Sequence, residues 1–488
     1  MPLAEAAVAL REEFDRGATA ERAFVLLYAF LDESPNGRFG WAPLGHRSVT
    51  GVSSDRHIHA WKDALRRSID DETPVAGLLE LCGVGEVLNA VAAAGRMSAE
   101  NSRDLVLTLR TLDSAFLGVH SADTLSSDDS PGLARLRSRL WRGEPLMRHG
   151  DLNVFPRPSR HMFPEVRGQS SLSELLDFLT VVRTGPNLSL DYQPLFDTLA
   201  SEGGEFRRIG IIPAIHSAGE LVWSKVGEDR YSIAETEPAD LVASRVCLAL
   251  NWLAEQGADL VLLPELVSGP RLVAAIAGHL GRMQGQGLTP PAMVLAGTYM
   301  AQDEYGHPRN RAVLLDSDGV ELWTQDKLHA YRFTADEQGR AGHPLGKDDV
   351  QDRDEQIAVE PRTIVVADLS AAMRVVVLTC EDFIQDRPHR ATLADIDITA
   401  LWVPVMSGPR PAPPAQGWIN DAAMHYVRHP GATSVVANSG ALLDAAHRSD
   451  HWQYSEVRAS PRTVPRWEAL KDEQGLPIAW LGVLDRAM

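Results

Sequence analysis

Cysteine, basic residues and long apolar runs are all scarce in this chain of 488 residues. Three cysteines are too few and too scattered for a disulfide framework or a thiolate zinc site. Lys and Arg total 47 against 66 Asp and Glu, and the net charge of −19 disfavours nucleic acid and anionic membranes as partners. No stretch approaches the roughly 20 apolar residues of a membrane span, and a signal-peptide pattern is missing at the N-terminus. We therefore expect a cytoplasmic protein.

The pattern of helical and β-rich segments changes twice along the chain, which predicts more than one domain. Residues 1–120 have a helical pattern, and residues 121–205 read as a linker-like segment with helices. From 206 to 488, short β-rich runs alternate with helical stretches. Because these strands are apolar on successive residues, both faces of their sheets should be buried, as in an α/β layer structure. We expect a mainly α-helical N-terminal domain followed by an α/β domain.

Three short segments of the C-terminal half each place a polar side chain at or just beyond the end of a strand-like run. The segments are Val261–Glu265, Asp326–His329 and Val375–Asp382, and they supply Glu265, Lys327 and Cys380. In α/β sheets, reactive groups gather beyond the carboxyl ends of the strands. We therefore expect these three side chains to converge.

A carboxylate, an ammonium and a thiol together suit the opening of a carbon–nitrogen bond through a covalent intermediate. Glu265 would take the proton of the Cys380 thiol and later hand it to departing ammonia. Lys327, with the backbone N–H of Glu381, would stabilise the oxyanion of the tetrahedral intermediate. Taken singly, each residue has an ordinary structural explanation, such as an inert buried thiol or a solvated charge. Their order and their flanking sequences favour catalysis.

The three segments, in this order, closely resemble the motifs of the nitrilase superfamily of carbon–nitrogen hydrolases. The resemblance covers roughly Phe206 to Met488 and includes two flanking segments, Asn310–Gly319 and Val435–Gly440. The sequence Cys380-Glu-Asp is similar to the glutaminase portion of glutamine-dependent NAD synthetases. The resemblance implies a nitrilase-like αββα sandwich that often dimerises through its sheets, so a homodimer or higher homo-oligomer is expected.

The resemblance also implies a second glutamate, in the loop after the lysine, that positions lysine and substrate. Glu337 is our candidate, and Asp336 is adjacent to it. Two excursions, Ser217–Pro238 and Gly339–Pro361, depart from the family pattern, and we expect both to edge the pocket. The acidic run Gln351–Glu355, within the second excursion, is interpreted as a solvated loop.

Neither a metal nor an organic cofactor is predicted. His57 and His59 could form a pair of metal ligands, but they lie at the start of a predicted helix and no third ligand is apparent. Asp421, His425 and His429 are spaced one helical turn apart and could hold zinc, but their helix would normally border the pocket of the family. The other two cysteines, Cys82 and Cys247, are interpreted as core residues.

The leading hypothesis is an amide hydrolase that acts on a small-molecule substrate through a Cys380 thioester. A nitrilase proper and an amine-dependent acyltransferase are alternatives of the same family. An alternative of another class is a catalytically relic binding or scaffold protein, whose helical N-terminal domain docks a protein partner. The sequence of that N-terminal region also allows a lid or an oligomerisation element.

Overall fold

A computed structural model describes most of the chain, in two compact units. The described residues are 2–34, 65, 67–75, 83–116, 131–158, 172, 176, 178–195, 206–348, 350–370, 372–409, 417–428, 432–443, 447, 450–458 and 466–484. The first unit comprises Met1–Pro186, Tyr192–Pro194 and Ala391–Asp397, and the second comprises Asn187–Asp191, Leu195–Arg390 and Ile398–Met488. Of the residues singled out in the sequence, His57–His59, Cys82 and His429 lie outside the described residues.

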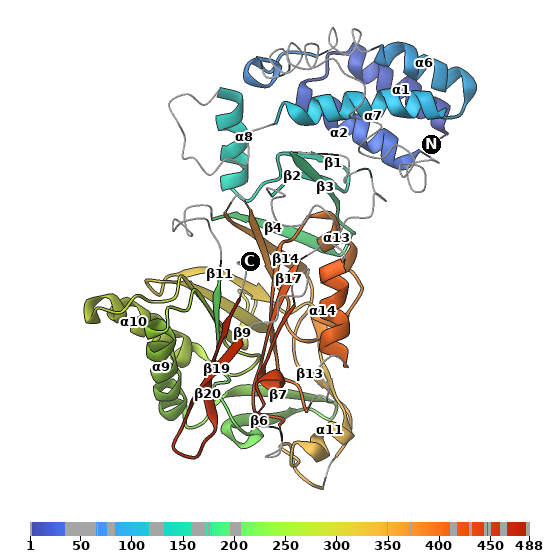
Figure 1. The fold of residues 1–488 in the computed structure, drawn as a ribbon. Helices are drawn as coiled ribbons and strands as arrows, with labels where there is room; N and C mark the ends of the chain where they lie inside the picture. Colours follow the sequence, from blue (N-terminus) through green and yellow to red (C-terminus); the bar gives the residue numbers. More distant parts are fainter. Residues whose placement is uncertain are drawn as a thin grey trace. The chain divides into compact units, whose positions relative to one another are not determined.

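The first unit combines helices with a small antiparallel sheet (Figure 1). Its elements are α1 (Leu3–Asp15), α2 (Ala20–Glu33), α6 (Val84–Ala94), α7 (Ala99–Ser114), α8 (Pro131–Trp141), β1 (Met147–His149), β2 (Leu152–Pro156) and β3 (Leu179–Arg183). Thr19 and Ser98 cap α2 and α7, because each hydroxyl accepts a backbone N–H of the first turn. In its described residues, the segment 121–205, interpreted as linker-like with helices, contains α8 and four paired strands, namely β1, β2, β3 and β4 (Leu188–Pro194).

The second unit contains a seven-stranded and a six-stranded sheet. The larger has the order β11-β10-β9-β8-β5-β20-β19, formed by β5 (Arg208–Ile211), β8 (Leu260–Leu262), β9 (Met293–Gln302), β10 (Pro308–Asp316), β11 (Glu321–Asp326), β19 (Arg466–Lys471) and β20 (Pro477–Val483). The smaller has the order β18-β17-β16-β15-β14-β4, formed by β4 (Leu188–Pro194), β14 (Arg362–Ser370), β15 (Met373–Val377), β16 (Ala400–Val405), β17 (Thr433–Asn438) and β18 (Ser455–Arg458).

Alternate residues of these strands fill two different cores, as the continuous apolar runs predict. In β8, Leu260 and Leu262 pack with residues of the smaller sheet such as Val375 and Trp402. Val261 belongs to the core on the opposite face, with residues of α9 (Ala239–Glu255) and α10 (Pro270–Met283). On the other side of the unit, α14 (Trp418–Arg428) contacts β17 and β18. Two sheets thus lie between two layers of helices (Figure 1).

The two atypical excursions of the chain pair with each other in a separate four-stranded sheet. It has the order β12-β13-β7-β6, formed by β6 (Leu221–Val226), β7 (Arg230–Thr236), β12 (Arg332–Phe333) and β13 (Arg353–Glu355). The short strand β13 runs parallel to β7, with Glu355 opposite Tyr231. The interpretation of residues 351–355 as a solvated loop is therefore wrong for its last part, because Arg353 and Glu355 are buried.

Two absences hold for the described part of the chain. Its helices include none that combines the length and apolarity needed to cross a membrane. It also contains no group of three or more His, Cys, Asp or Glu side chains arranged to hold a metal ion.

Candidate active site

Cys380 stands at a sharp elbow after β15, a strand that pairs in parallel with β16. Its backbone has φ 46° and ψ −99°, an uncommon conformation for a residue with a side chain. Such a conformation costs on the order of 1–3 kcal/mol and persists where the surroundings enforce it. The Cys380 N–H donates to Pro404 O at 3.0 Å, which anchors the elbow to β16. The helix α12 (Glu381–Ile384) follows directly.

Glu265 lies three residues after β8 and is held at both carboxylate oxygens. Its Oε1 accepts from Asn310 Nδ2 at 3.0 Å and from Lys327 Nζ at 2.7 Å, and its Oε2 accepts from the N–H of Met406 at 3.2 Å. Gly297 permits this loop to pass closely, because a Cβ there would lie 2.5 Å from Pro264 O. The Glu265 charge also acts on the Cys380 thiol, whose pKa it raises in addition to the effect of burial.

Lys327, at the end of β11, is clamped between two carboxylates. Its Nζ lies 2.7 Å from Glu265 Oε1 and 2.7 Å from Glu355 Oε2. It also lies 5.8 Å from the centre of the Tyr331 ring, within the range of a cation–π contact. Glu265 and Lys327 are each 2% exposed and Glu355 is 3% exposed. Ion pairs this deeply buried need further hydrogen bonds, and both carboxylates accept them from other donors.

Two residues that the sequence reasoning did not assign to the site complete it. Asn310 Nδ2 bridges the two acids, at 3.0 Å from Glu265 Oε1 and 2.8 Å from Glu355 Oε1. Glu355 Oε2 also accepts the backbone N–H of Tyr331 at 3.1 Å. Asn310 was visible only as part of a flanking motif. The sequence around Glu355 did not indicate a buried site residue, because its burial depends on the pairing of β13 with the distant β7.

The expected second glutamate, Glu337, does not occupy the position beside the lysine. It lies in α11 (Ala335–Arg340), where its carboxylate accepts from Tyr331 Oη at 2.5 Å and from the Thr334 N–H at 2.9 Å. Among the described residues, the ion pairs of Lys327 are with Glu265 and Glu355. This finding corrects the prediction that Glu337 is the glutamate that positions the lysine. Asp336, its neighbour, is exposed.

The charges of the site interact strongly because they are shielded from water. Burial raises the pKa of the Glu265 carboxyl most; Lys327 opposes this rise and Glu355 adds to it. Burial lowers the pKa of Lys327, but the two carboxylates more than offset it and leave this pKa well above its ordinary value. Burial, with the Glu265 charge, raises the pKa of the Cys380 thiol well above its ordinary value. The resting thiol therefore keeps its proton and needs a base in order to react.

A cavity of about 420 Å³ lies at Cys380. It is lined by Tyr331, Glu337, Arg340, Ala341, Cys380, Glu381, Ile384, Met406, Ser407, Gly408, Pro409, Trp418 and Leu442. Cys380 is 6% exposed and contributes to this lining, so the thiol is not sealed in hydrocarbon. Glu381 begins α12, where its N–H has no carbonyl partner within the helix. The volume suits a small organic ligand.

Comparison with known proteins finds similarity in solved structures alone. No family model matches this chain, and no curated protein sequence matches it. A mutant of the Nesterenkonia AN1 amidase from the nitrilase superfamily is 16% identical, with a TM-score of 0.36, over 58% of this chain and 93% of its own. The glutamine-dependent NAD+ synthetase from Acinetobacter baumannii is 15% identical, with a TM-score of 0.32, over 48% of this chain and 38% of its own.

Proposed function

We propose that this protein hydrolyses a non-peptide carbon–nitrogen bond, by preference an amide, through a thioester on Cys380. One observation carries the proposal. The Cys380 thiol lines a cavity and feels the charge of a buried carboxylate, Glu265, which a buried lysine holds at 2.7 Å. A buried one-to-one ion pair would suffice for packing. A thiol beside a carboxylate that can accept its proton suits nucleophilic catalysis.

The first half-reaction forms the thioester. Cys380 Sγ attacks the amide carbon while the thiol proton moves to the Glu265 carboxylate, and the carbonyl oxygen becomes an oxyanion. Lys327 and the Glu381 N–H stabilise that oxyanion. The carbon–nitrogen bond then breaks as Glu265 returns the proton to the nitrogen, and ammonia or an amine leaves. Losing one oxyanion donor typically costs about 3–4 kcal/mol of transition-state stabilisation.

The second half-reaction consumes one water. Glu265 accepts a proton from that water, whose oxygen attacks the thioester carbon. The carbon–sulfur bond breaks, the acid product departs, and the thiolate recovers its proton from Glu265. Throughout the cycle, Glu355 and Asn310 hold Lys327 and Glu265 in position. No metal or organic cofactor enters these steps.

Trapping of the acyl-enzyme tests the proposal directly. The protein is mixed with a panel of small amides, ureas, carbamoyl amino acids and nitriles, quenched with acid and measured by intact mass. We expect an adduct on Cys380 whose mass equals the substrate minus ammonia for an amide. Cys380→Ala should form no adduct and lose turnover by about 10⁴-fold or more while its thermal unfolding is retained.

Each outcome of the panel decides between the remaining hypotheses. Adducts from nitriles alone would assign nitrilase activity, and product formation that depends on an added amine would assign acyl transfer. Full turnover in Cys380→Ala would refute the thioester. The absence of both adduct and turnover across the panel, with intact fold, would favour a relic binding protein.

A further inference from the structure

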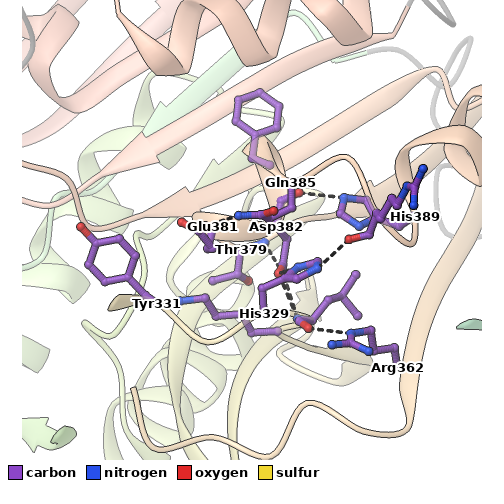
Figure 2. Close-up of polar contacts among 12 residues, drawn as sticks. His329, Tyr331, Arg362, Thr379, Glu381, Asp382, Gln385 and His389 are labelled. Atoms are coloured by element: carbon purple, nitrogen blue, oxygen red, sulfur yellow. Dashed lines mark hydrogen bonds and ion pairs between the residues drawn. The ribbon is translucent and has the colours of Figure 1, made fainter. Parts of the chain in front are cut away.

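Asp382 joins the chain segment that carries the lysine to the one that carries the cysteine. Both of its carboxylate oxygens accept the N–H of Leu328, at 3.1 and 3.0 Å, and Leu328 directly follows Lys327. Its Oδ2 also lies 3.4 Å from the N–H of Thr379, the residue before Cys380. Figure 2 shows this carboxylate between Thr379 and the His329 ring. One buried side chain therefore touches the neighbours of both proposed reactive groups.

This link is significant because the two reactive groups come from different sheets. Lys327 follows β11 of the seven-stranded sheet, whereas Cys380 follows β15 of the six-stranded sheet. No ladder of backbone hydrogen bonds runs between two stacked sheets, so their relative position depends on side-chain contacts. Asp382 supplies such a contact at the point where the reacting atoms must meet.

His329 fixes the Asp382 carboxylate from the other side. Its Nδ1 lies 2.9 Å from Asp382 Oδ1 and its Nε2 lies 2.8 Å from Arg387 O. Both ring nitrogens of His329 therefore face oxygen acceptors, which fixes the orientation of the ring beside the buried carboxylate. The His389 ring is tilted by 52° to the His329 ring, with 5.6 Å between ring centres, and His389 donates from Nε2 to Asp382 O at 2.7 Å. Burial lowers the pKa of His389 to about 4, so that ring is neutral.

The surrounding backbone is tied into the same group of contacts. Arg362 Nε donates to Leu328 O at 3.0 Å. The Asp382 N–H donates to Thr379 O at 3.0 Å and closes the elbow. Leu328 and Asp382 are both about 1% exposed, so solvent cannot replace these bonds.

We propose that Asp382, oriented by His329, is a positioning residue that sets the distance between Lys327 and Cys380. This inference rests on the proposed function of the site. Asp382 is not among the residues that line the cavity at Cys380, and we assign it no contact with substrate. Substitution of Asp382 should therefore lower kcat rather than raise KM, because the binding contacts stay in place while the reacting groups shift.

The test compares Asp382→Asn with a matched control, Asp368→Asn. Asp368 is also a fully buried acid, paired through both oxygens with Arg374 between β14 and β15, away from the cavity. We expect Asp382→Asn to lower kcat by about 100-fold with KM changed less than about threefold, as for a misplacement of about 1 Å. Asp368→Asn should lose comparable thermal stability and keep its kcat. Equal losses of kcat in the two variants would overturn the proposal.

A double-mutant cycle tests the role given to His329 and remains informative if Asp382→Asn folds poorly. His329→Gln keeps a donor toward Asp382 but removes the ring that also reaches Arg387 O, and we expect kcat to fall by about tenfold. Because His329 acts through Asp382, the double variant should lose no more than Asp382→Asn alone. Fully additive losses would contradict the proposed linkage. Unchanged kcat in a folded His329→Gln variant would do so as well.

Alkylation of Cys380 by iodoacetamide separates this inference from the proposed function. The modification rate at Cys380, followed by peptide mass, requires the thiol and its base in register but no amide turnover. A slower rate in Asp382→Asn with an unchanged rate at Cys247 would support the positioning role even if the wild-type protein hydrolysed no amide. Unchanged rates at both cysteines in the folded variant, with unchanged kcat, would refute it.

Discussion

Two clusters of buried charge in the second unit differ in composition. Arg374 and Asp368 are both fully buried and form a bidentate pair, with Nε to Oδ1 at 2.7 Å and Nη2 to Oδ2 at 2.8 Å. At the candidate active site, one cation, Lys327, lies between two carboxylates, Glu265 and Glu355. The arginine binds both oxygens of one carboxylate, whereas the lysine is shared by two carboxylates.

This difference in pairing separates a packing role from a chemical one. In the bidentate arginine pair, both carboxylate oxygens of Asp368 accept from the cation, which holds the carboxylate in its ionised form. In the lysine cluster, burial and the second carboxylate raise the pKa of Glu265, so this group takes up a proton more readily than an ordinary glutamate. The thiol and the cavity lie beside the second cluster. Equal burial therefore does not indicate equal function.

Removal of the cation from each cluster gives the largest expected effect. Lys327→Met should lower kcat by about 10²–10³-fold, because an oxyanion donor is lost. It should also destabilise the fold by about 3–5 kcal/mol, because two buried carboxylates lose their partner. Arg374→Met should cost a similar free energy of unfolding but keep kcat in the folded fraction. Chemical denaturation and steady-state kinetics on an amide identified by mass trapping measure both quantities.

The comparison fails if both substitutions reduce kcat equally in folded protein. In that case, the arginine pair would contribute to the geometry of the site as much as the lysine cluster does.

The two glutamates near Lys327 provide the next test. Glu355→Gln should lower kcat by about 100-fold, because Lys327 loses one of the two anchors that hold it. Glu337→Gln should change kcat by less than about tenfold and act mainly on KM, since Glu337 lines the cavity and bonds Tyr331. The reverse order of effects would return the lysine-positioning role to Glu337. Both variants are isosteric, so each serves as the control for the other.

The smallest expected effect is a shift of the pH profile. Glu265 must be ionised to act as base, and its raised pKa places the acid limb of kcat/KM above the ordinary glutamate value of about 4.3. Activity is lost as the pH falls through that limb. Glu355→Gln removes a like charge and should move the limb to lower pH by about one unit, whereas Glu337→Gln should leave it in place. A limb that moves to higher pH in Glu355→Gln would contradict this account.

Much of the second unit follows from patterns that are local in the chain. Successive apolar residues in runs such as Val261–Leu263 predict sheets buried on both faces, and two cores lie on opposite sides of β8. Glu265, Lys327 and Cys380 were expected to converge because each ends a strand-like run. In the structure, Lys327 and Glu265 form an ion pair, the Glu265 charge acts on the Cys380 thiol, and Cys380 lines the cavity.

The supporting residues of the site do not follow from such patterns. The segment Gln351–Glu355 is polar throughout and resembles a solvated loop, yet β13 pairs with β7 more than 100 residues away and buries Glu355. Asp382 was visible in the cysteine motif, but its bonds to Leu328 and His329 cross between sheets. Contacts of this kind have no periodicity for a sequence to display.

Strand patterning and the identity of the reactive groups are encoded in short stretches of the chain, because burial on both faces and strand-end chemistry are local properties. The number of carboxylates around Lys327, the protonated state of the thiol and the link between the two sheets arose from long-range packing. These features depend on the distance and shielding between charges, and folding brings together groups that are remote along the backbone.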